Sequence, residues 1–563
     1  MSNNAVTWKK WLLLPILIAI GGILLFGPAK SSYHRFKESR SLTQAKSFFD
    51  KADYANAAIS ARQVLLLNPT NAQACRIMAD LADMSQSPAA LDYRRQLAEA
   101  DPSPENKLKL AEAGLRYQSR PYPLTTQILE ELSATTTNLP FYHVVAAEHA
   151  LAIRQFATAE KQFAAAVALD PTNRLYQLNL AVVGLTSANP ATLTAARDRL
   201  KSFVTDTNYS AAALRTLIID RLAHDDAAGA RDYSEQLLRT LRAPVSDRLQ
   251  YLAILQKIQS ADFPAQLDAV QQFAATNAPA AMQVVMWMQA NGLATNAVNW
   301  TTRLSKSVRD QPAVELATAL AIETMHDWPG LRQFCMRGNW NDFDFMRLAF
   351  LSRAWKQLGE TTVAQSNWHT AVDAASGRFG ALASLIDLTA RWQMADERRE
   401  LFWKMFQKFP RERWVSAALE EQCFLNSDTA GLNRIYRQLT MVFPDNAEFK
   451  NNLAYTCLLL RTNQVEAETL ADHLYAQAPN DPTIASTHAF ALHLRKRDAE
   501  GLAVLQKLSP EALKQPSLAL CLGLLLEATG DHAGAQRALT NAHGSIRLLP
   551  EEKQLLDATE GRH

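Results

Sequence analysis

Apolar and small residues recur along most of the chain at the spacing of amphipathic helices, and one arrangement returns at a fixed interval. Residues 52–71 read ADYANAAISARQVLLLNPTN, and residues 154–173 read RQFATAEKQFAAAVALDPTN. Each segment has an aromatic residue near its start, then small residues one helical turn apart, and Pro-Thr-Asn at its end. The prolines, Pro69 and Pro171, are 102 residues apart, three times thirty-four. This pattern predicts helix pairs that repeat every thirty-four residues.

The repeat frame can be set independently in the two halves of the chain. In the N-terminal half, repeats that begin at residues 38, 140 and 174 place Ala159 at the twentieth position of its repeat. In the C-terminal half, repeats that begin at residues 345, 379, 413, 447 and 516 place Ala535 at the same position. Residues 38–549 span 512 positions, which is fifteen periods of thirty-four with two residues over, so the two frames agree.

This spacing resembles the tetratricopeptide repeat (TPR) family, whose pattern has small residues at repeat positions 8 and 20 and proline at 32. The resemblance covers nearly all residues after 38. It implies an all-α fold, a right-handed α-solenoid of about fifteen helix-turn-helix repeats and about thirty repeat helices. Small residues let the two helices of a repeat approach closely, and stacking of neighbours buries the remaining apolar surface. We therefore expect Ala159 and Ala535 at close helix crossings.

The signature is clear at both ends of the array and weak between them. The segments that follow from it are an N-terminal TPR array (38–207), a degenerate TPR-like helical region (208–344), a C-terminal TPR array (345–549) and a capping helix with a tail (550–563). A differently packed helical insert is the alternative for 208–344. In the capping helix, Leu555 and Leu556 are expected to face the array.

The N-terminal segment is apolar enough to cross a membrane. Residues 11–27 read WLLLPILIAIGGILLFG, with lysine or arginine on both sides. A helix over 11–29 would be about 28 Å long, close to the thickness of the hydrocarbon core. We expect a short tail (1–10), a single transmembrane helix (11–29) and a juxtamembrane linker (30–37). A cleaved signal peptide is the alternative.

Composition and charge narrow the possible functions. The 58 Lys and Arg nearly balance the 56 Asp and Glu, so the sequence lacks the excess of positive charge that nucleic-acid-binding proteins show. The five cysteines are scattered without a C-x-x-C pair, which argues against a disulfide framework or a zinc site and favours buried thiols. We found no phosphate-binding loop, H-E-x-x-H or nucleophile elbow. We expect no enzymatic activity and no cofactor.

The TPR resemblance also implies a binding surface, because positions 5, 9 and 12 of the first helix of each repeat face the concave groove in that family. Carried onto this sequence, the pattern gives a partner-binding groove of two basic and five apolar residues: Arg353, Lys356, Phe424, Tyr455, Phe490, Leu520 and Leu524. Apolar side chains suit an amphipathic helix or an extended peptide, and the basic pair would engage an acidic flank. The alternative is that the aromatic residues pack on neighbouring repeats.

This layout is typical of a bacterial single-pass membrane protein. The expected function is a scaffold that holds an unidentified partner protein or peptide, or an envelope or secretion assembly, through the TPR groove. The alternatives are a periplasmic holdase-like chaperone and a non-catalytic subunit of a polysaccharide or protein export machine. We expect the inner (cytoplasmic) membrane as the location, with the solenoid in the periplasm, since long domains translocate largely regardless of charge. A cytoplasmic solenoid is the alternative.

Overall fold

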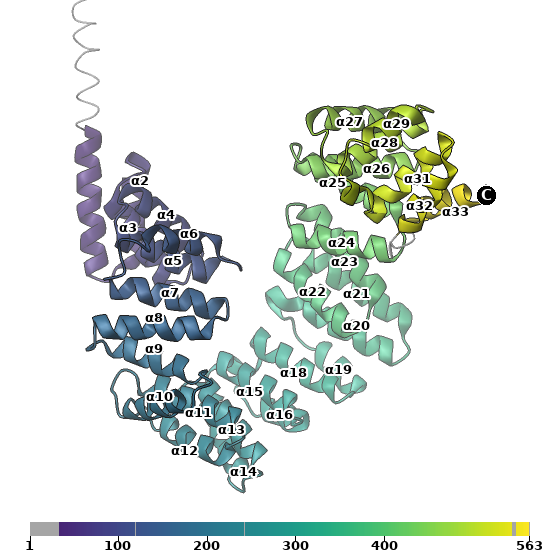
Figure 1. The fold of residues 1–563 in the computed structure, drawn as a ribbon. Helices are drawn as coiled ribbons and strands as arrows, with labels where there is room; N and C mark the ends of the chain where they lie inside the picture. The colour runs from purple at the N-terminus through teal and green to yellow at the C-terminus, as the bar shows by residue number, and fades with distance from the viewer. Residues whose placement is uncertain (1–32, 119, 241–242, 543–547, 562–563) are drawn as a thin grey trace, which may run out of the picture. The chain divides into compact units, whose positions relative to one another are not determined.

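The computed structural model describes residues 33–118, 120–240, 243–542 and 548–561, and the regular structure in these ranges is entirely helical (Figure 1). The chain divides into two compact units, Met1–Val270 and Gln271–His563, which are described separately. The all-α prediction is therefore confirmed for the described residues.

In the first unit, the helices between residues 54 and 257 each pack against their neighbours in the sequence. The described helices of this unit are the one over residues 33–50, α2 (Tyr54–Leu67), α3 (Ala72–Met84), α4 (Ala89–Ala100), α5 (Pro104–Tyr117), α6 (Pro123–Leu132), α7 (Pro140–Ala152), α8 (Phe156–Leu169), α9 (Arg174–Gly184), α10 (Pro190–Ser202), α11 (Ser210–Ala223), α12 (Ala227–Leu238), α13 (Val245–Lys257) and the first part of α14 (Phe263–Ala274).

The second unit continues from the end of α14. Its helices are α15 (Ala278–Ala290), α16 (Ala294–Thr301), α17 (Lys306–Arg309), α18 (Pro312–Thr324), α19 (Trp328–Cys335), the 3-10 helix η1 (Asn341–Phe343), α20 (Asp344–Gln357), α21 (Thr361–Ala375), α22 (Phe379–Arg391), α23 (Ala395–Lys408), α24 (Arg413–Leu425), α25 (Thr429–Val442), α26 (Ala447–Leu459), α27 (Gln464–Gln477), α28 (Pro482–Leu494), α29 (Asp498–Leu505), α30 (Pro510–Leu513), α31 (Pro516–Ala528), α32 (His532–Ala542) and α33 (Pro550–Glu560).

These helices form a repeat. In the described part of the chain there are fifteen consecutive pairs, from residues 33–50 with α2 to α31 with α32, as the thirty-four-residue period predicts. The short helices α17, η1 and α30 lie in connections, and α33 follows the last pair. Pairs α11–α12 to α18–α19 continue the repeat through residues 208–344, where the sequence signature is weak.

A residue with left-handed backbone conformation separates the two helices in fourteen of the fifteen described pairs. These residues have φ between +51° and +89°, and between residues 225 and 530 they recur every 33 to 35 positions. They are Ala52, Gln86, Tyr122, Arg154, Asp225, Gln259, Gly292, His326, Gly359, Gln393, Ser427, Arg461, Lys496 and Gly530. Glycine adopts this conformation without strain, yet eleven of the fourteen are other residues. The backbone repeat is therefore more regular than the sequence that encodes it.

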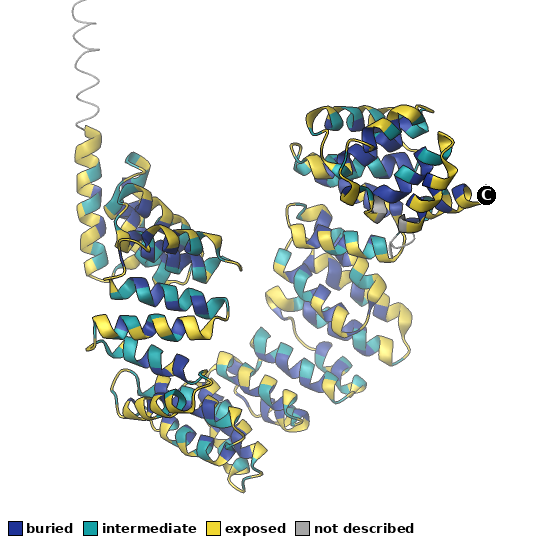
Figure 2. Ribbon diagram, viewed as in Figure 1, coloured by how far each residue is buried: buried dark blue, intermediate teal, exposed yellow. Residues whose placement is uncertain are grey.

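Small residues allow close packing between paired helices, and the buried positions lie along the facing sides of the helices (Figure 2). Ala159 and Ala535 are both completely buried, as the repeat frame predicts. At the last pair, a Cβ atom added to Gly523 would lie 2.6 Å from Cγ of Leu539 and closer still to its Cδ2. The helices α31 and α32 therefore approach too closely there for any side chain.

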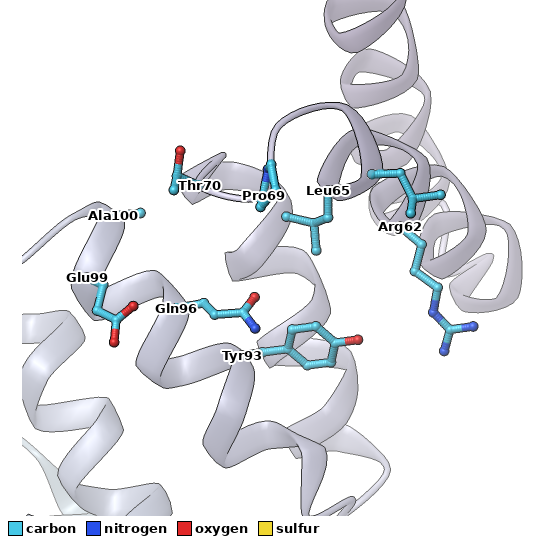
Figure 3. A pocket seen from close by; sticks show the side chains of 9 residues that line it. Arg62, Leu65, Pro69, Thr70, Tyr93, Gln96, Glu99 and Ala100 are labelled. Carbon is cyan, nitrogen blue, oxygen red and sulfur yellow. The ribbon is translucent and has the colours of Figure 1, made fainter.

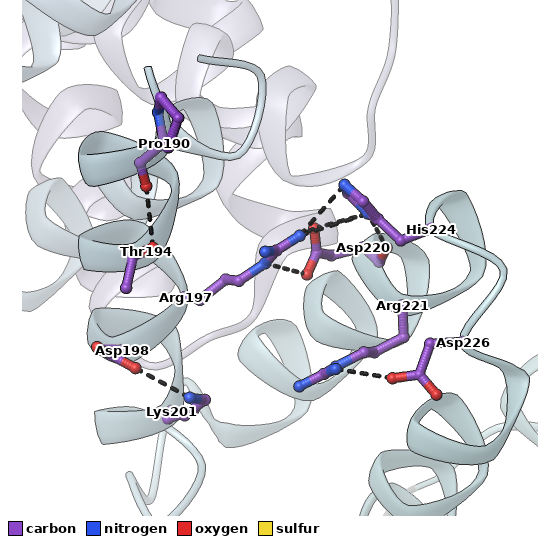
Figure 4. Close-up of polar contacts among 9 residues, drawn as sticks. All are labelled: Pro190, Thr194, Arg197, Asp198, Lys201, Asp220, Arg221, His224 and Asp226. Atoms are coloured by element: carbon purple, nitrogen blue, oxygen red, sulfur yellow. Dashed lines mark hydrogen bonds and ion pairs between the residues drawn. The ribbon is translucent and has the colours of Figure 1, made fainter. Parts of the chain in front are cut away.

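Arginine–aspartate pairs join different helices of the first unit, as Arg197 and Asp220 do in Figure 4. The guanidinium of Arg197, on α10, donates two hydrogen bonds of 2.8 and 2.9 Å to Asp220 on α11, whose side chain is only 3% exposed. Arg215 on α11 donates two similar bonds to Asp247 on α13. Each pair neutralises a buried carboxylate. These pairs hold the weakly patterned repeats together, and the repeat pattern alone did not reveal them.

The transmembrane helix predicted over residues 11–29 lies outside the described residues. Among the helices from residue 33 onward that the structure describes, none combines the length and the hydropathy that a membrane span requires.

Candidate functional site

The seven residues predicted to bind a partner lie on the first helices of five pairs in the second unit. Arg353 and Lys356 are on α20, Phe424 on α24, Tyr455 on α26, Phe490 on α28, and Leu520 and Leu524 on α31. We call these seven residues the candidate surface. The structure divides them into a buried set and an accessible set.

Three of the apolar residues belong to the hydrophobic core of the unit. Phe490 and Leu520 are each 3% exposed and Leu524 is 5% exposed. The ring of Phe490 packs edge-on against Tyr455, with centroids 5.9 Å apart. Their burial has a clear origin, because α31 packs at once against α28, α29, α32 and α33. For these residues the packing alternative describes the structure, and a partner would reach them only after a rearrangement.

Tyr455 is in contact with the C-terminal helix of the chain. Its hydroxyl donates a 2.5 Å hydrogen bond to Oε1 of Glu552 on α33. One residue earlier on the same helix, Glu551 accepts a hydrogen bond from the hydroxyl of Thr429 at the start of α25. The helix predicted to cover the last repeat therefore also reaches side chains 97 and 122 positions earlier in the sequence.

The contact face of α33 is both apolar and acidic. Leu549 and Leu556 are buried, and Leu555 packs against the same core, so both leucines predicted to face the array do so. Glu552 also accepts the backbone N–H of Leu549 at 2.7 Å, which closes the first turn of the helix. Burial raises the pKa of the Glu552 carboxyl and that of the Tyr455 hydroxyl. Tyr455 therefore stays protonated at neutral pH and donates.

Arg353 is a half-buried cation without an acidic partner in the described part of the chain. Its guanidinium lies 5.8 Å from the ring centroid of Trp328 and 5.5 Å from that of Trp392. Its buried Nε has no hydrogen-bond partner. Glu323, which Trp392 contacts, is already engaged, because its carboxylate accepts hydrogen bonds from Trp392 Nε1 and from Arg391. The two tryptophans hold the cation in place while its charge stays available.

The remaining members of the candidate surface are accessible to solvent. Lys356 is 47% exposed, and its ammonium lies 3.7 Å from Glu397, a loose ion pair. Phe424 packs against the core with one part and leaves the rest exposed. Arg353, Lys356 and Phe424 thus form the accessible set, whereas α33 engages Tyr455 directly.

Two cavities outside the candidate surface were not expected from the sequence. A cleft of about 650 Å³ in the first unit is bordered by α2, the following turn and α4 (Figure 3). Its lining includes Arg62, Leu65, Tyr93 and Glu99. A second cavity of about 530 Å³ is lined by residues 298–338. It contains Glu315, whose pKa is raised to about 7, first by burial and then by Asp310.

The described residues include few candidates for metal-binding or catalytic groups. No group of three or more His, Cys, Asp or Glu side chains in the described ranges is arranged to hold a metal ion. All five cysteines are free and buried, as expected for structural thiols. Burial raises the pKa of Cys335, Cys423 and Cys521 to about 12, so these thiols are protonated at neutral pH.

Comparisons with known proteins found similarity among solved structures alone. No family model and no curated protein matches the sequence. Among solved structures, it is similar to a chain in the crystal structure of the APC/C hetero-tetramer Cut9–Hcn1, with a TM-score of 0.28 and 11% identity over 90% of this chain and 96% of that one. It is also similar to a chain in the structure of Naa15/Naa10 bound to HypK-THB, with a TM-score of 0.27 and 11% identity over 93% and 96% of the two chains. The fifteen helix pairs define the class of protein: an all-α helical repeat solenoid.

Proposed function

We propose that this protein is a non-catalytic scaffold that holds a partner protein through the candidate surface of its C-terminal repeats. One observation carries the proposal. A separate helix, α33, already lies against this surface and is held there by leucines and by two carboxylates. An amphipathic helix laid on a solenoid is a common mode of peptide recognition. The same side chains that hold α33 are suited to hold a helix of a partner.

The position of Arg353 favours a partner that carries an acidic group. A guanidinium that packs near two aromatic rings is preorganised, so little side-chain entropy is lost when a carboxylate binds it. Lys356, one helical turn further along α20, adds a second positive charge on the same side of the helix. The partner segment would therefore carry acidic residues beside its apolar ones.

The proposal includes a location. Residues 11–29 would anchor the chain as a single pass in the inner membrane of a bacterium, with the solenoid in the periplasm. It is supported by the length and composition of the apolar segment. Protease added to spheroplasts should digest the solenoid. A protected solenoid would place it in the cytoplasm and overturn this part of the proposal.

Partner capture from membranes tests the role of the candidate surface. We would crosslink the full chain in membranes, recover it, and compare the wild type with an Arg353→Gln, Lys356→Gln variant. Replacing residues that anchor an interface typically weakens binding by tenfold or more, so we expect at least a tenfold loss of one specific partner. The control is Lys408→Gln with Arg411→Gln, which removes the same charges from exposed positions near the end of α23. Equal recovery by both variants would refute the proposed surface.

A further inference from the structure

The position of α33 departs from the solenoid rule that each helix packs on its neighbours in sequence. Its packing on α31 is local, but Glu551 and Glu552 reach α25 and α26, which belong to repeats two and three before the last. A cover for the final repeat needs only the outer side of α31 and α32. The contacts with Thr429 and Tyr455 therefore call for a different explanation.

The hydrogen bonds that hold α33 could be replaced by hydrogen bonds from another helix. Both carboxylates accept hydrogen bonds from neutral hydroxyls, and neither forms an ion pair with a cation of the described residues. Glu552 is mostly removed from water, and a buried carboxylate without a cation gives little net stabilisation. The groups are well matched in geometry, yet their replacement by equivalent groups from another helix would lose little free energy.

The short length of α33 also suits a helix that can be displaced. An isolated helix of eleven residues is below the roughly 12–15 residues that a helix needs to be marginally stable in water. Its order therefore depends on docking through a small set of side chains, chiefly Leu549, Leu556 and Glu552. Its opposite face, with Lys553, Gln554 and Asp557, is exposed. Such a helix can undock without unfolding the repeats beneath it.

We propose that α33 is an intramolecular competitor of the partner, and that the partner presents an amphipathic acidic helix with the same arrangement of two adjacent carboxylates followed by a pair of leucines. This inference rests on the proposed function, because it names the regulation and the ligand class of the same surface. In the resting chain α33 covers Tyr455 and Thr429. A partner helix displaces α33, binds these hydroxyls and extends toward the free cation of Arg353.

The test uses the full chain in detergent micelles and a fluorescent synthetic peptide of residues 548–561, followed by anisotropy. Leu556→Asp places a charge at a 2% exposed position and should release α33 in the chain while leaving the repeats intact. A short tether gives α33 an effective concentration on the order of 1 mM, so a peptide with a Kd of about 10 µM would be excluded about 100-fold. We expect the Leu556→Asp chain to bind the peptide at least tenfold more tightly than the wild type. Gln554→Asp, which adds the same charge on the exposed face, should behave like the wild type.

A second variant keeps the proposal testable if Leu556→Asp disturbs the fold. Tyr455→Phe retains the ring and removes only the hydroxyl that donates to Glu552. Amide hydrogen exchange in residues 550–560 should rise several-fold in this variant, with little change in α28 and α31. Equal peptide binding by the wild type and Leu556→Asp, together with unchanged exchange in Tyr455→Phe, would show that α33 is a fixed part of the core. A dimer in light scattering of the wild type would assign the docked helix to a second copy and overturn the intramolecular version.

The outcomes separate this inference from the proposed function. If partner capture depends on Arg353 and Lys356 but Leu556→Asp does not increase it, the competitor role fails and the scaffold proposal stands. If Leu556→Asp exposes a peptide-binding surface but no partner depends on Arg353 and Lys356, the scaffold proposal fails instead.

Discussion

The close crossing of α31 and α32 gives the sharpest stability prediction, the replacement of Gly523 by alanine. In an exposed helix interior this change is favourable by about 1 kcal/mol, because glycine is the poorer helix former. At Gly523 the new Cβ would lie 2.6 Å from Cγ of Leu539, which is itself 2% exposed and surrounded by core residues. Overpacking of a core typically costs about 1–3 kcal/mol. The steric term is the larger, and we expect a net loss of about 1–2 kcal/mol.

The assay is urea unfolding of the full chain, followed by a probe in the second unit. Gly380→Ala on α22 is the matched control, because an added Cβ there meets nothing within 4 Å. This variant should be neutral or slightly stabilising. A Gly523→Ala, Leu539→Ala double mutant should lose less than the sum of the two single changes, since the smaller side chain removes the clash. If Gly523→Ala is as harmless as Gly380→Ala, the close crossing, and with it the repeat frame at the C-terminal end, is wrong.

Three further predictions concern the repeats. Gln393 has φ of +57°, so Gln393→Gly should stabilise the second unit by up to about 1 kcal/mol. Gly359 has φ of +88°, so Gly359→Ala should destabilise the unit by about the same amount. Thermal melting would show whether each variant is more or less stable than the wild type. Arg197→Ala leaves the buried Asp220 without its partner and should cost about 2–3 kcal/mol in urea unfolding, and the Arg197→Ala, Asp220→Ala pair should recover part of this loss. Burial, the nearby Glu112 charge and a weaker opposing effect of Arg116 leave the pKa of Glu148 at about 7, against 4.5 when unfolded, so the stability of the first unit should fall as pH rises from about 4.5 to 7. Glu148→Gln should remove this dependence and stabilise the unit above pH 7 by at most about 3 kcal/mol, and an unchanged pH profile of unfolding would contradict the assignment.

Much of the fold follows from local sequence, because each repeat needs small residues where its helices cross. Ala159 and Ala535 are both completely buried, as residues at such crossings must be, and the described residues contain the fifteen pairs that the two frames predict. The signature fades in residues 208–344, yet the helix pairs continue there. The left-handed turns do not require glycine, because Asp225, Gln259 and His326 adopt the same conformation in that region, so the backbone can keep the repeat where the sequence pattern is weak.

The binding surface was less predictable, because it depends on contacts between distant residues. Helical periodicity correctly turns Leu555 and Leu556 inward, but nothing local shows that Glu552 meets Tyr455, 97 positions away. Phe490, Leu520 and Leu524 occupy positions that face the groove in TPR proteins, yet α33 and neighbouring helices bury them here. Arg353 was identified from its repeat position alone. The two tryptophans that hold it lie at the turns inside two other pairs, because Trp328 begins α19 and Trp392 follows α22.

A reversible lock on α33 tests most directly whether the candidate surface holds the partner. Thr429→Cys and Glu551→Cys place two thiols where the native side chains meet, and a reducible thiol crosslinker would join them in membranes. The five native cysteines are buried, so the chain without the new pair serves as the control. The account predicts that the locked chain recovers at least tenfold less partner, and that reduction of the crosslink restores recovery. A locked chain that still holds its partner at the wild-type level would show that the partner does not bind the side chains that α33 covers.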